Sequence, residues 1–218
     1  MGRENHRREG DRLRRVDRQE VERIIREGRE TLGVEFKRSM SWQDDNAKAK
    51  VVKAALAMAN KRDGGIIIFG LTPPVKAGPH TFDGMSDVDY ASFNQDDVMA
   101  RVNAHASPSI DLTVHHESDI GGKQCVVIEV REFADQPVIC SKELVVEKKT
   151  VLFRGRVYCR SRRMIESTEV ISVEDMREII ELGVDKGLTR YLRRRGIADQ
   201  VGGIVDNDEK FRRQRGDL

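Results

Sequence analysis

Long apolar runs are missing from this sequence of 218 residues. No run approaches the roughly 18 to 20 residues that a membrane-spanning helix needs. The arginine-rich N-terminus also has no apolar core of the kind that defines a signal peptide. We therefore expect a soluble chain that has no membrane segment and is located in the cytoplasm.

Cysteine is also scarce, with Cys125, Cys140 and Cys159 far apart and no CxxC pair. This odd number and wide spacing predict neither a disulfide framework nor a zinc knuckle, and they fit a reducing cytoplasm. Phosphate-cradling motifs are absent too, because neither GxxxxGK[ST] nor GxGxxG occurs. We predict no ATP site.

A charge excess of one sign is likewise absent. The chain has 39 basic and 37 acidic residues, which leaves a net charge of +2 although charged residues make up 35% of the sequence. The usual charged fraction is about 25%, so the surplus is of both signs. Net charge alone therefore predicts no polyanionic partner.

Much of this charge lies at the two ends of the chain. Residues 1–30 hold 10 basic and 8 acidic residues, and residues 185–218 hold 9 and 6. Such segments are poor in core-building side chains, so we expect neither end to belong to the packed body. We divide the chain into a charged N-terminal helix or arm (1–28), a central domain (29–184), and a charged C-terminal helix and tail (185–218).

Apolar periodicity in the central part predicts both helices and strands. Helical patterns cover 11–29, 46–61, 94–106 and 172–182, and strand patterns cover 34–37, 66–69, 110–118, 123–132, 138–140, 151–153 and 157–160. Residues 72–93 show no sustained period and read as a lid, a binding loop or a disordered patch. The expected fold class is α+β: a single domain with a mixed β-sheet flanked by helices, and charged helical ends.

Local charge is more informative than the total, because residues 142–163 hold 8 basic and only 2 acidic side chains. In a strand, side chains alternate between faces, so Arg156, Tyr158 and Arg160 line up on one face. Guanidinium groups spaced about 6 to 7 Å apart can follow a nucleic-acid backbone while an aromatic ring stacks on a base. The alternative is a solvated sheet face or an edge strand kept soluble by charge.

Three segments together resemble the Schlafen AlbA-type domain family. They are residues 30–39 (ETLGVEFKRS), 57–71 (AMANKRDGGIIIFGL) and 157–160 (VYCR). The resemblance covers about residues 29–184, and it implies a DNA-binding module. Where the family pattern continues with a Gly-Ser step, this chain has Ser161-Arg162-Arg163. The added basic charge favours contact with a polyanion.

Some Schlafen-like proteins are metal-dependent endoribonucleases that cut transfer or ribosomal RNA with three carboxylates. The resemblance assigns two of these to Glu30 and Glu35, which would hold Mg²⁺ or Mn²⁺ as catalytic metal ligands. The third acid of those nucleases is missing, because Leu71-Thr72-Pro73-Pro74 occupies its position. Asp83 or Asp87 could substitute, although nothing in the spacing shows it.

Three hypotheses follow from the sequence. The first is a nucleic-acid-binding protein that needs no cofactor and contacts the phosphate backbone through Lys37, Arg38, Arg156, Tyr158, Arg160, Arg162 and Arg163. The second is the metal-dependent endoribonuclease, so whether the chain is an enzyme stays open. The third is a non-catalytic protein-interaction or dimerisation domain, with the long loop and the charged end helix as its interface. Schlafen cores are built from two similar lobes that form a positively lined cleft. A chain with one lobe would have to pair with itself to make that cleft, so we also expect a homodimer.

Overall fold

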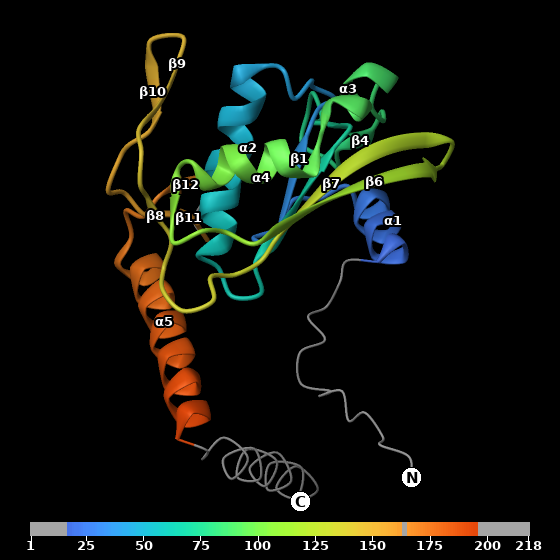
Figure 1. Cartoon of the computed structure of the whole chain (residues 1–218). Coiled ribbons are helices and arrows are strands. Elements are labelled where there is room, and N and C mark those ends of the chain that lie inside the picture. Colours follow the sequence, from blue (N-terminus) through green and yellow to red (C-terminus); the bar gives the residue numbers. More distant parts are fainter. Residues whose placement is uncertain (1–16, 163–164, 196–218) are drawn as a thin grey trace, which may run out of the picture.

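A four-stranded mixed sheet forms the centre of the molecule in the computed structural model, which describes residues 17–162 and 165–195 (Figure 1). Its strand order is β1 (Val34–Lys37), β2 (Gly65–Phe69), β7 (Lys123–Val130) and β6 (Leu112–Ile120). Strands β1 and β2 are parallel, and the other two pairings are antiparallel. This arrangement confirms the α+β class and the mixed sheet.

Both faces of the sheet are covered, and the apolar residues of β2 show why. Ile66 and Ile68 belong to one buried cluster with α1 (Arg18–Glu27), whereas Ile67 and Phe69 belong to a second, larger cluster with α2 (Asp45–Ala59). Successive strand side chains point to opposite faces, so a strand that is apolar throughout needs cover on both sides. The strand expected at 66–69 is confirmed as β2, and it lies inside the sheet.

Helix α1 departs from the expectation for the N-terminal segment. It begins after Asp17, whose side chain accepts a 2.8 Å hydrogen bond from the backbone N–H of Glu20, and it ends at the left-handed Gly28. Its apolar residues Val21, Ile24 and Ile25 are buried against the sheet. The expectation that this end stands apart from the packed body is therefore wrong for α1.

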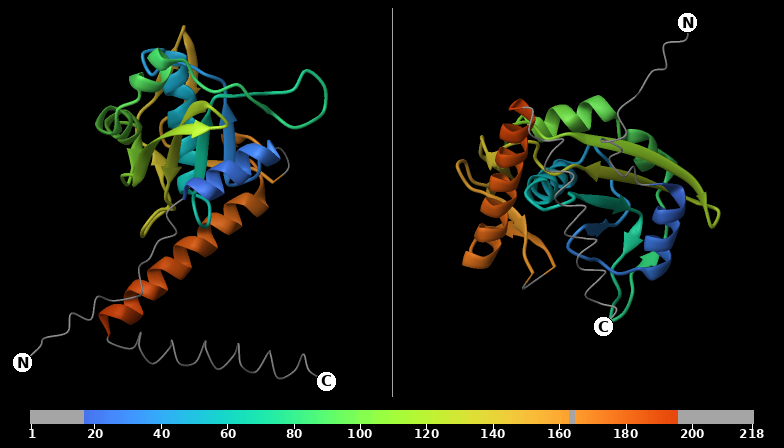
Figure 2. Two further views of the ribbon diagram at one scale, coloured as in Figure 1. Left: turned by 90° about the vertical axis from the view of Figure 1, so that its right-hand side faces the viewer. Right: turned by 90° about the horizontal axis from the view of Figure 1, so that it is seen from below.

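The expected long loop at 72–93 contains secondary structure. It holds β3 (Leu71–Thr72), β4 (Thr81–Phe82) and α3 (Asp87–Ser92), and α3 begins at Ser86, whose side chain accepts from the N–H of Asp89. The first two strands pair with each other, and the loop between them extends from the body in the left view of Figure 2. Short elements of this kind contain too few residues for a periodic pattern to emerge.

The remaining elements follow in chain order. They are α4 (Gln95–Asn103), β5 (Ala106–Ser107), β8 (Ile139–Cys140), β9 (Leu144–Val146), β10 (Lys149–Leu152), β11 (Tyr158–Arg160), β12 (Ser167–Glu169) and α5 (Val173–Arg194). Helix α5 runs 12 residues past the predicted end at Leu182. Gly183 and Gly187 do not stop it, because glycine weakens a helix by only about 1 kcal/mol relative to alanine.

All three cysteines are free and buried. Burial raises the pKa of the Cys125 and Cys159 thiols to about 12, so both are protonated at neutral pH. Among the residues that the structure describes, no helix is long and apolar enough to cross a membrane.

Candidate functional site

Two charged residues from distant sequence segments meet inside the protein. Glu35 on β1 and Arg160 on β11 are 6% and 5% exposed, and Arg160 Nη1 lies 2.7 Å from Glu35 Oε2. The other terminal nitrogen, Nη2, donates to the carbonyls of Thr31 and Val34 at 2.9 and 3.1 Å. Arg160 therefore ties the β11 ribbon to β1 and is not available to a ligand at the surface.

Two further side chains complete the surroundings of Glu35. Ser167 Oγ donates to Glu35 Oε2 at 2.9 Å, and the Lys37 ammonium donates to Oε1. Both carboxylate oxygens are thus engaged, and two of the three partners are cations. Buried charges need such pairing because a lone buried charge costs several kcal/mol.

A second internal network is built on Asn60, at the end of α2. Its amide nitrogen donates to the carbonyls of Val138 and Tyr158 at 2.8 and 3.0 Å, and its oxygen accepts from the N–H of Val138 at 2.7 Å. The Tyr158 hydroxyl accepts from the N–H of Phe153 at 2.9 Å. Residues from the three sequence segments thus join β1, the end of α2 and β11 to one another.

These contacts overturn the expected exposed face of β11. Tyr158 is 1% exposed, so it offers no ring to a base, and Arg160 is buried as described above. The strand is only three residues long and begins at Tyr158, so Arg156 lies outside it, next to the turn at Gly155 (φ 78°). Arg156 is exposed and lies 3.7 Å from Glu169.

The other expected contact residues are spread over the molecule. Arg162 is exposed and pairs with Glu178 of α5 at 2.8 Å, and Arg163 lies outside the described residues. Lys37 pairs with the buried Glu35. Arg38 is exposed and forms no ion pair with any part of the chain that the structure describes. The seven residues therefore do not form one continuous cationic face.

The two glutamates of the nuclease hypothesis do not fit a divalent metal ion. Glu30 Oε1 accepts a 2.7 Å hydrogen bond from the backbone N–H of Phe36, and Glu35 is neutralised by Arg160 and Lys37. Hard cations need several oxygens free of competing cations. Within residues 17–162 and 165–195, no three His, Cys, Asp or Glu side chains form a group that could hold a metal. Asp87 instead accepts from Gln124 at 2.7 Å.

We expect transfer RNA and ribosomal RNA to remain intact after incubation with the full chain and Mg²⁺ or Mn²⁺. The physical reason is that a metal at Glu35 would have to displace two cationic partners. Denaturing gel electrophoresis measures the outcome. Metal-dependent fragments that are produced by the native chain and are lost in Glu30→Gln would show that these carboxylates do support cleavage.

The unpaired cations of the basic segment lie elsewhere, on a projection that we call the basic arm, residues 142–154. The arm consists of the β9–β10 ribbon and its flanks, and it stands away from the central sheet (Figure 1). Its cations are Lys142, Lys148, Lys149 and Arg154, and all four are exposed. None of them pairs with a carboxylate of the described residues.

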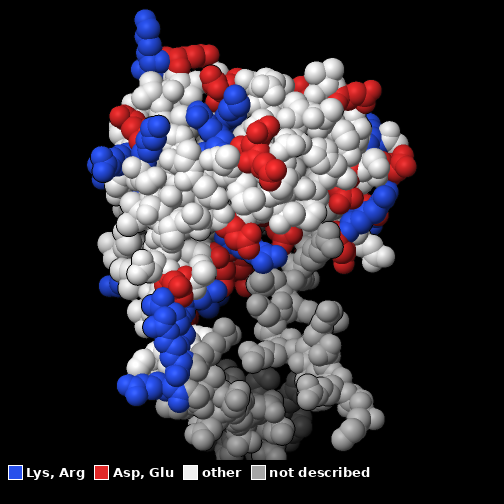
Figure 3. Space-filling view, viewed as in Figure 1, with Lys and Arg blue, Asp and Glu red and all other residues white. Residues whose placement is uncertain are grey.

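The cations of the basic arm lie in two places, at its tip and at its base. At the tip, Glu147 and Lys148 both have positive φ (49° and 65°), which is typical of a tight hairpin turn. At the base, the N–H of Gly155 donates to the carbonyl of Cys140 at 2.7 Å, which brings the turn containing Arg154 beside the start of the arm. Figure 3 shows cationic side chains standing at the tip of this projection.

The two acids of the basic arm are engaged by neutral groups. Glu143 accepts from the Thr150 hydroxyl at 3.1 Å, and Glu147 accepts from the side-chain amide of Asn46 at 3.0 Å. Residues 142–154 thus have four cations and two acids, for a net charge of +2. Phe153, at the base, is 46% exposed. An exposed ring beside cations is a combination found in proteins that bind single-stranded nucleic acid.

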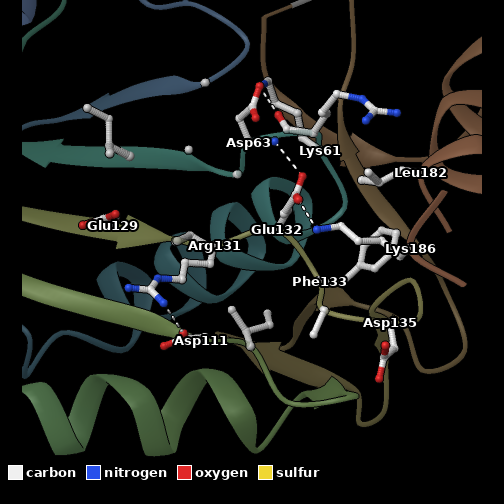
Figure 4. Close-up of a pocket in the computed structure, with 18 of the residues that line it drawn as sticks. Lys61, Asp63, Asp111, Glu129, Arg131, Glu132, Phe133, Asp135, Leu182 and Lys186 are labelled. Carbon is white, nitrogen blue, oxygen red and sulfur yellow. Dashed lines mark hydrogen bonds and ion pairs between the residues drawn. The ribbon is translucent and has the colours of Figure 1, made fainter. Parts of the chain in front are cut away.

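A broad groove of about 1150 Å³ lies between the start of β2, the end of β7 and α5 (Figure 4). Its charges are of both signs, and most of its cations are paired with carboxylates, with Lys61 and Arg194 as the exceptions among the described residues. Arg131 lies 3.1 Å from Asp111, and Glu132 accepts from Lys186 and from the N–H of Asp63. A groove whose cations are already neutralised in this way offers little attraction to a polyanion.

Lys61 differs from the paired cations of the groove. Its ammonium donates to the carbonyl of Arg62 at 2.7 Å, and burial lowers its pKa below the usual value. It makes no ion pair with the carboxylates in the described part of the groove. A single half-buried lysine beside mutually paired charges does not make this groove an anion site.

The comparison with protein families decides the relationship of this chain. The model of the family described as Schlafen, AlbA_2 matches residues 30–169. The chain belongs to the Schlafen AlbA_2 family. The match covers both internal networks and the basic arm, and it ends just before α5. No curated protein matches the sequence.

Two solved structures are similar to this Schlafen AlbA_2 chain. The DIP2311 protein from Corynebacterium diphtheriae is 18% identical with a TM-score of 0.44, and the match covers 69% of this chain and 29% of that one. The N-terminal domain of a putative ATP-dependent DNA helicase RecG-related protein from Nitrosomonas europaea is 21% identical with a TM-score of 0.39. That match covers 51% of this chain and 71% of the other. This chain therefore spans less than a third of the DIP2311 protein.

Proposed function

We propose that this Schlafen AlbA_2 protein binds nucleic acid and that the basic arm contacts the phosphate backbone. The observation that carries the proposal is the exposure of Lys142, Lys148, Lys149 and Arg154 without a carboxylate partner in the described residues. Unpaired ammonium and guanidinium groups release counterions from a phosphate backbone on binding, and this release supplies affinity. The resemblance of this chain to a family of DNA-binding modules supports the same assignment.

The shape of the basic arm supports this reading. A two-stranded ribbon is one of the elements that the major groove of B-form DNA can accommodate. Strands β9 and β10 pair with a short turn between Val146 and Lys149, so the tip is narrow. Phosphate contacts position a protein without reading sequence, and we therefore propose recognition of backbone and shape.

We expect the full chain to bind mixed-sequence nucleic acid at low salt with an affinity that falls steeply as salt rises. Replacing Lys142, Lys148, Lys149 and Arg154 together by glutamine removes up to four phosphate contacts. Each contact contributes about −0.9 to the slope of log K against log salt, so the slope becomes shallower by about three to four and affinity at 0.1 M salt falls roughly 100-fold or more. Fluorescence anisotropy with labelled DNA and RNA duplexes and single strands measures both quantities.

A matched control removes the same charge from another exposed surface. Arg26, Arg29, Arg38 and Lys76 are exposed and form no ion pair within the described residues, so their joint replacement by glutamine keeps the net charge equal to that of the arm variant. We expect this control to change the slope by less than one. Equal losses in the two variants would show that binding follows net charge and not the basic arm. No binding of any probe at low salt would refute the proposed function.

A further inference from the structure

Helix α5 has apolar side chains that nothing in the described structure covers. Between 37% and 62% of each is exposed in a set that we call the apolar stripe: Val173, Met176, Ile180, Val184, Leu188 and Tyr191. Their spacings of three or four residues place them on one face of the helix. Ile179 and Leu182 lie on a different face and are buried against the body. An apolar strip along 22 residues of helix, about 33 Å at 1.5 Å per residue, is typical of an interaction surface.

The charges of α5 are divided along its length. Residues 173–185 contain five acidic residues and one basic residue, whereas residues 186–195 contain five basic and no acidic residues. The space-filling view shows cations gathered over the C-terminal half (Figure 3). Lys186 and Arg190 already pair with Glu132 and Asp135, and Glu178 and Asp185 already pair with Arg162 and Arg62. Arg194 and Arg195 remain exposed without an ion pair among the described residues, and antiparallel pairing places them beside the acidic first turn of the other α5. A parallel pair would place like charges together, which is unfavourable.

The surroundings of α5 leave space for a second helix. A Cβ atom added at Gly187, which is three residues after Val184 and next to Leu188 of the apolar stripe, would meet nothing within 4 Å, and glycine there lets another backbone approach closely. The C-terminal half of α5 extends away from the sheet in the left view of Figure 2. An antiparallel partner would therefore have its own body at the opposite end of the helix pair.

We propose that two copies of this chain form a dimer through antiparallel pairing of α5 along the apolar stripe, with the two-fold axis beside Val184. Val184 is the stripe residue nearest to the boundary between the acidic and basic halves. A two-fold axis makes the interface self-complementary, so one stripe and one charge division serve both copies. This inference stands apart from the proposed function, because it uses α5 and not the basic arm.

Light scattering of the full chain at tens of micromolar tests the dimer. We expect a mass of twice 24.8 kDa. Val184→Glu places two like charges beside the axis and should return the mass of one chain, with an unchanged helical circular-dichroism signal. Thr189→Glu adds the same charge at an exposed position outside the apolar stripe and should leave the dimer intact. If light scattering of the native chain gives the mass of one chain, the proposal is overturned. Coverage of the stripe by residues 196–218 of the same chain would give that result.

Disulfide trapping tests the orientation. Val184→Cys should form a linked dimer under mild oxidation, since the two copies of residue 184 meet at the axis. Val173→Cys should not, because 11 residues on each side of the axis separate its two copies by about 33 Å. The native cysteines are buried and contribute no background. Efficient linking at both positions would indicate parallel pairing and contradict the inference, as would a dimer that forms only after nucleic acid is added.

Discussion

Replacing Arg160 by methionine is expected to lower the free energy of unfolding by about 3 kcal/mol, the lower end of the range for breaking a buried ion pair, because the buried Glu35 carboxylate keeps only Lys37 as a cationic partner. Glu35 would lose its 2.7 Å contact with Arg160 Nη1 while remaining 6% exposed. The carbonyls of Thr31 and Val34 would lose their donor as well. Urea denaturation followed by circular dichroism measures this change.

A neighbouring arginine supplies the matched control. Arg156→Met removes an exposed guanidinium that lies 3.7 Å from Glu169, so we expect a change within about 0.5 kcal/mol. The double variant Glu35→Gln/Arg160→Met removes both charges, and it should be more stable than the sum of the single effects. If Arg160→Met is as mild as Arg156→Met, the buried pair does not have the structural role that its geometry indicates.

Gly64→Ala is expected to have an effect of similar size for a different reason. Gly64 adopts φ +65°, and a Cβ atom there would lie 2.1 Å from the carbonyl oxygen of Val130. The left-handed conformation costs a non-glycine residue about 1–2 kcal/mol, and the steric conflict adds about 1–3 kcal/mol. We therefore expect a loss of about 2–5 kcal/mol in the free energy of unfolding.

Gly121→Ala separates these two contributions. Gly121 has φ +60°, and a Cβ atom at that position would meet nothing within 4 Å. This variant should therefore show only the conformational cost of about 1–2 kcal/mol. Equal losses for the two alanine variants would mean that the close approach of Val130 to Gly64 contributes nothing. The same urea unfolding measurement applies to both.

Several elements could be predicted from the sequence because their causes are local. Apolar periodicity predicted the strands at 34–37 and 66–69, and both are present. The helical pattern at 46–61 corresponds to α2, which Asp44 caps. The helical pattern at 11–29 ends close to Gly28, the left-handed end of α1. Caps, turns and periodic faces depend on residues within a few positions of each other, so sequence patterns report them.

The candidate site was predicted less well, and Arg160 shows why. The sequence placed a basic segment at 142–163, but it could not tell which of its cations would meet a carboxylate from a distant segment. Glu35 lies 125 positions before Arg160, and their contact arises only when β11 packs beside β1. Lys148 and Lys149, by contrast, are exposed at the turn of the β9–β10 ribbon, whose Leu144, Val146 and Leu152 are buried in the core. The sequence around each residue does not distinguish a buried cation that pairs with a carboxylate from a cation that stays exposed.

The sequence by itself determined the fold class, the family motifs and the segment in which cationic residues concentrate. Tertiary structure alone decided which of those cations are exposed, which are neutralised inside, and that Glu35 is paired with Arg160 and Lys37. The physical reason is that exposure and ion pairing depend on which distant segments pack together. Side chains of one segment can therefore have opposite roles although their sequence surroundings are alike.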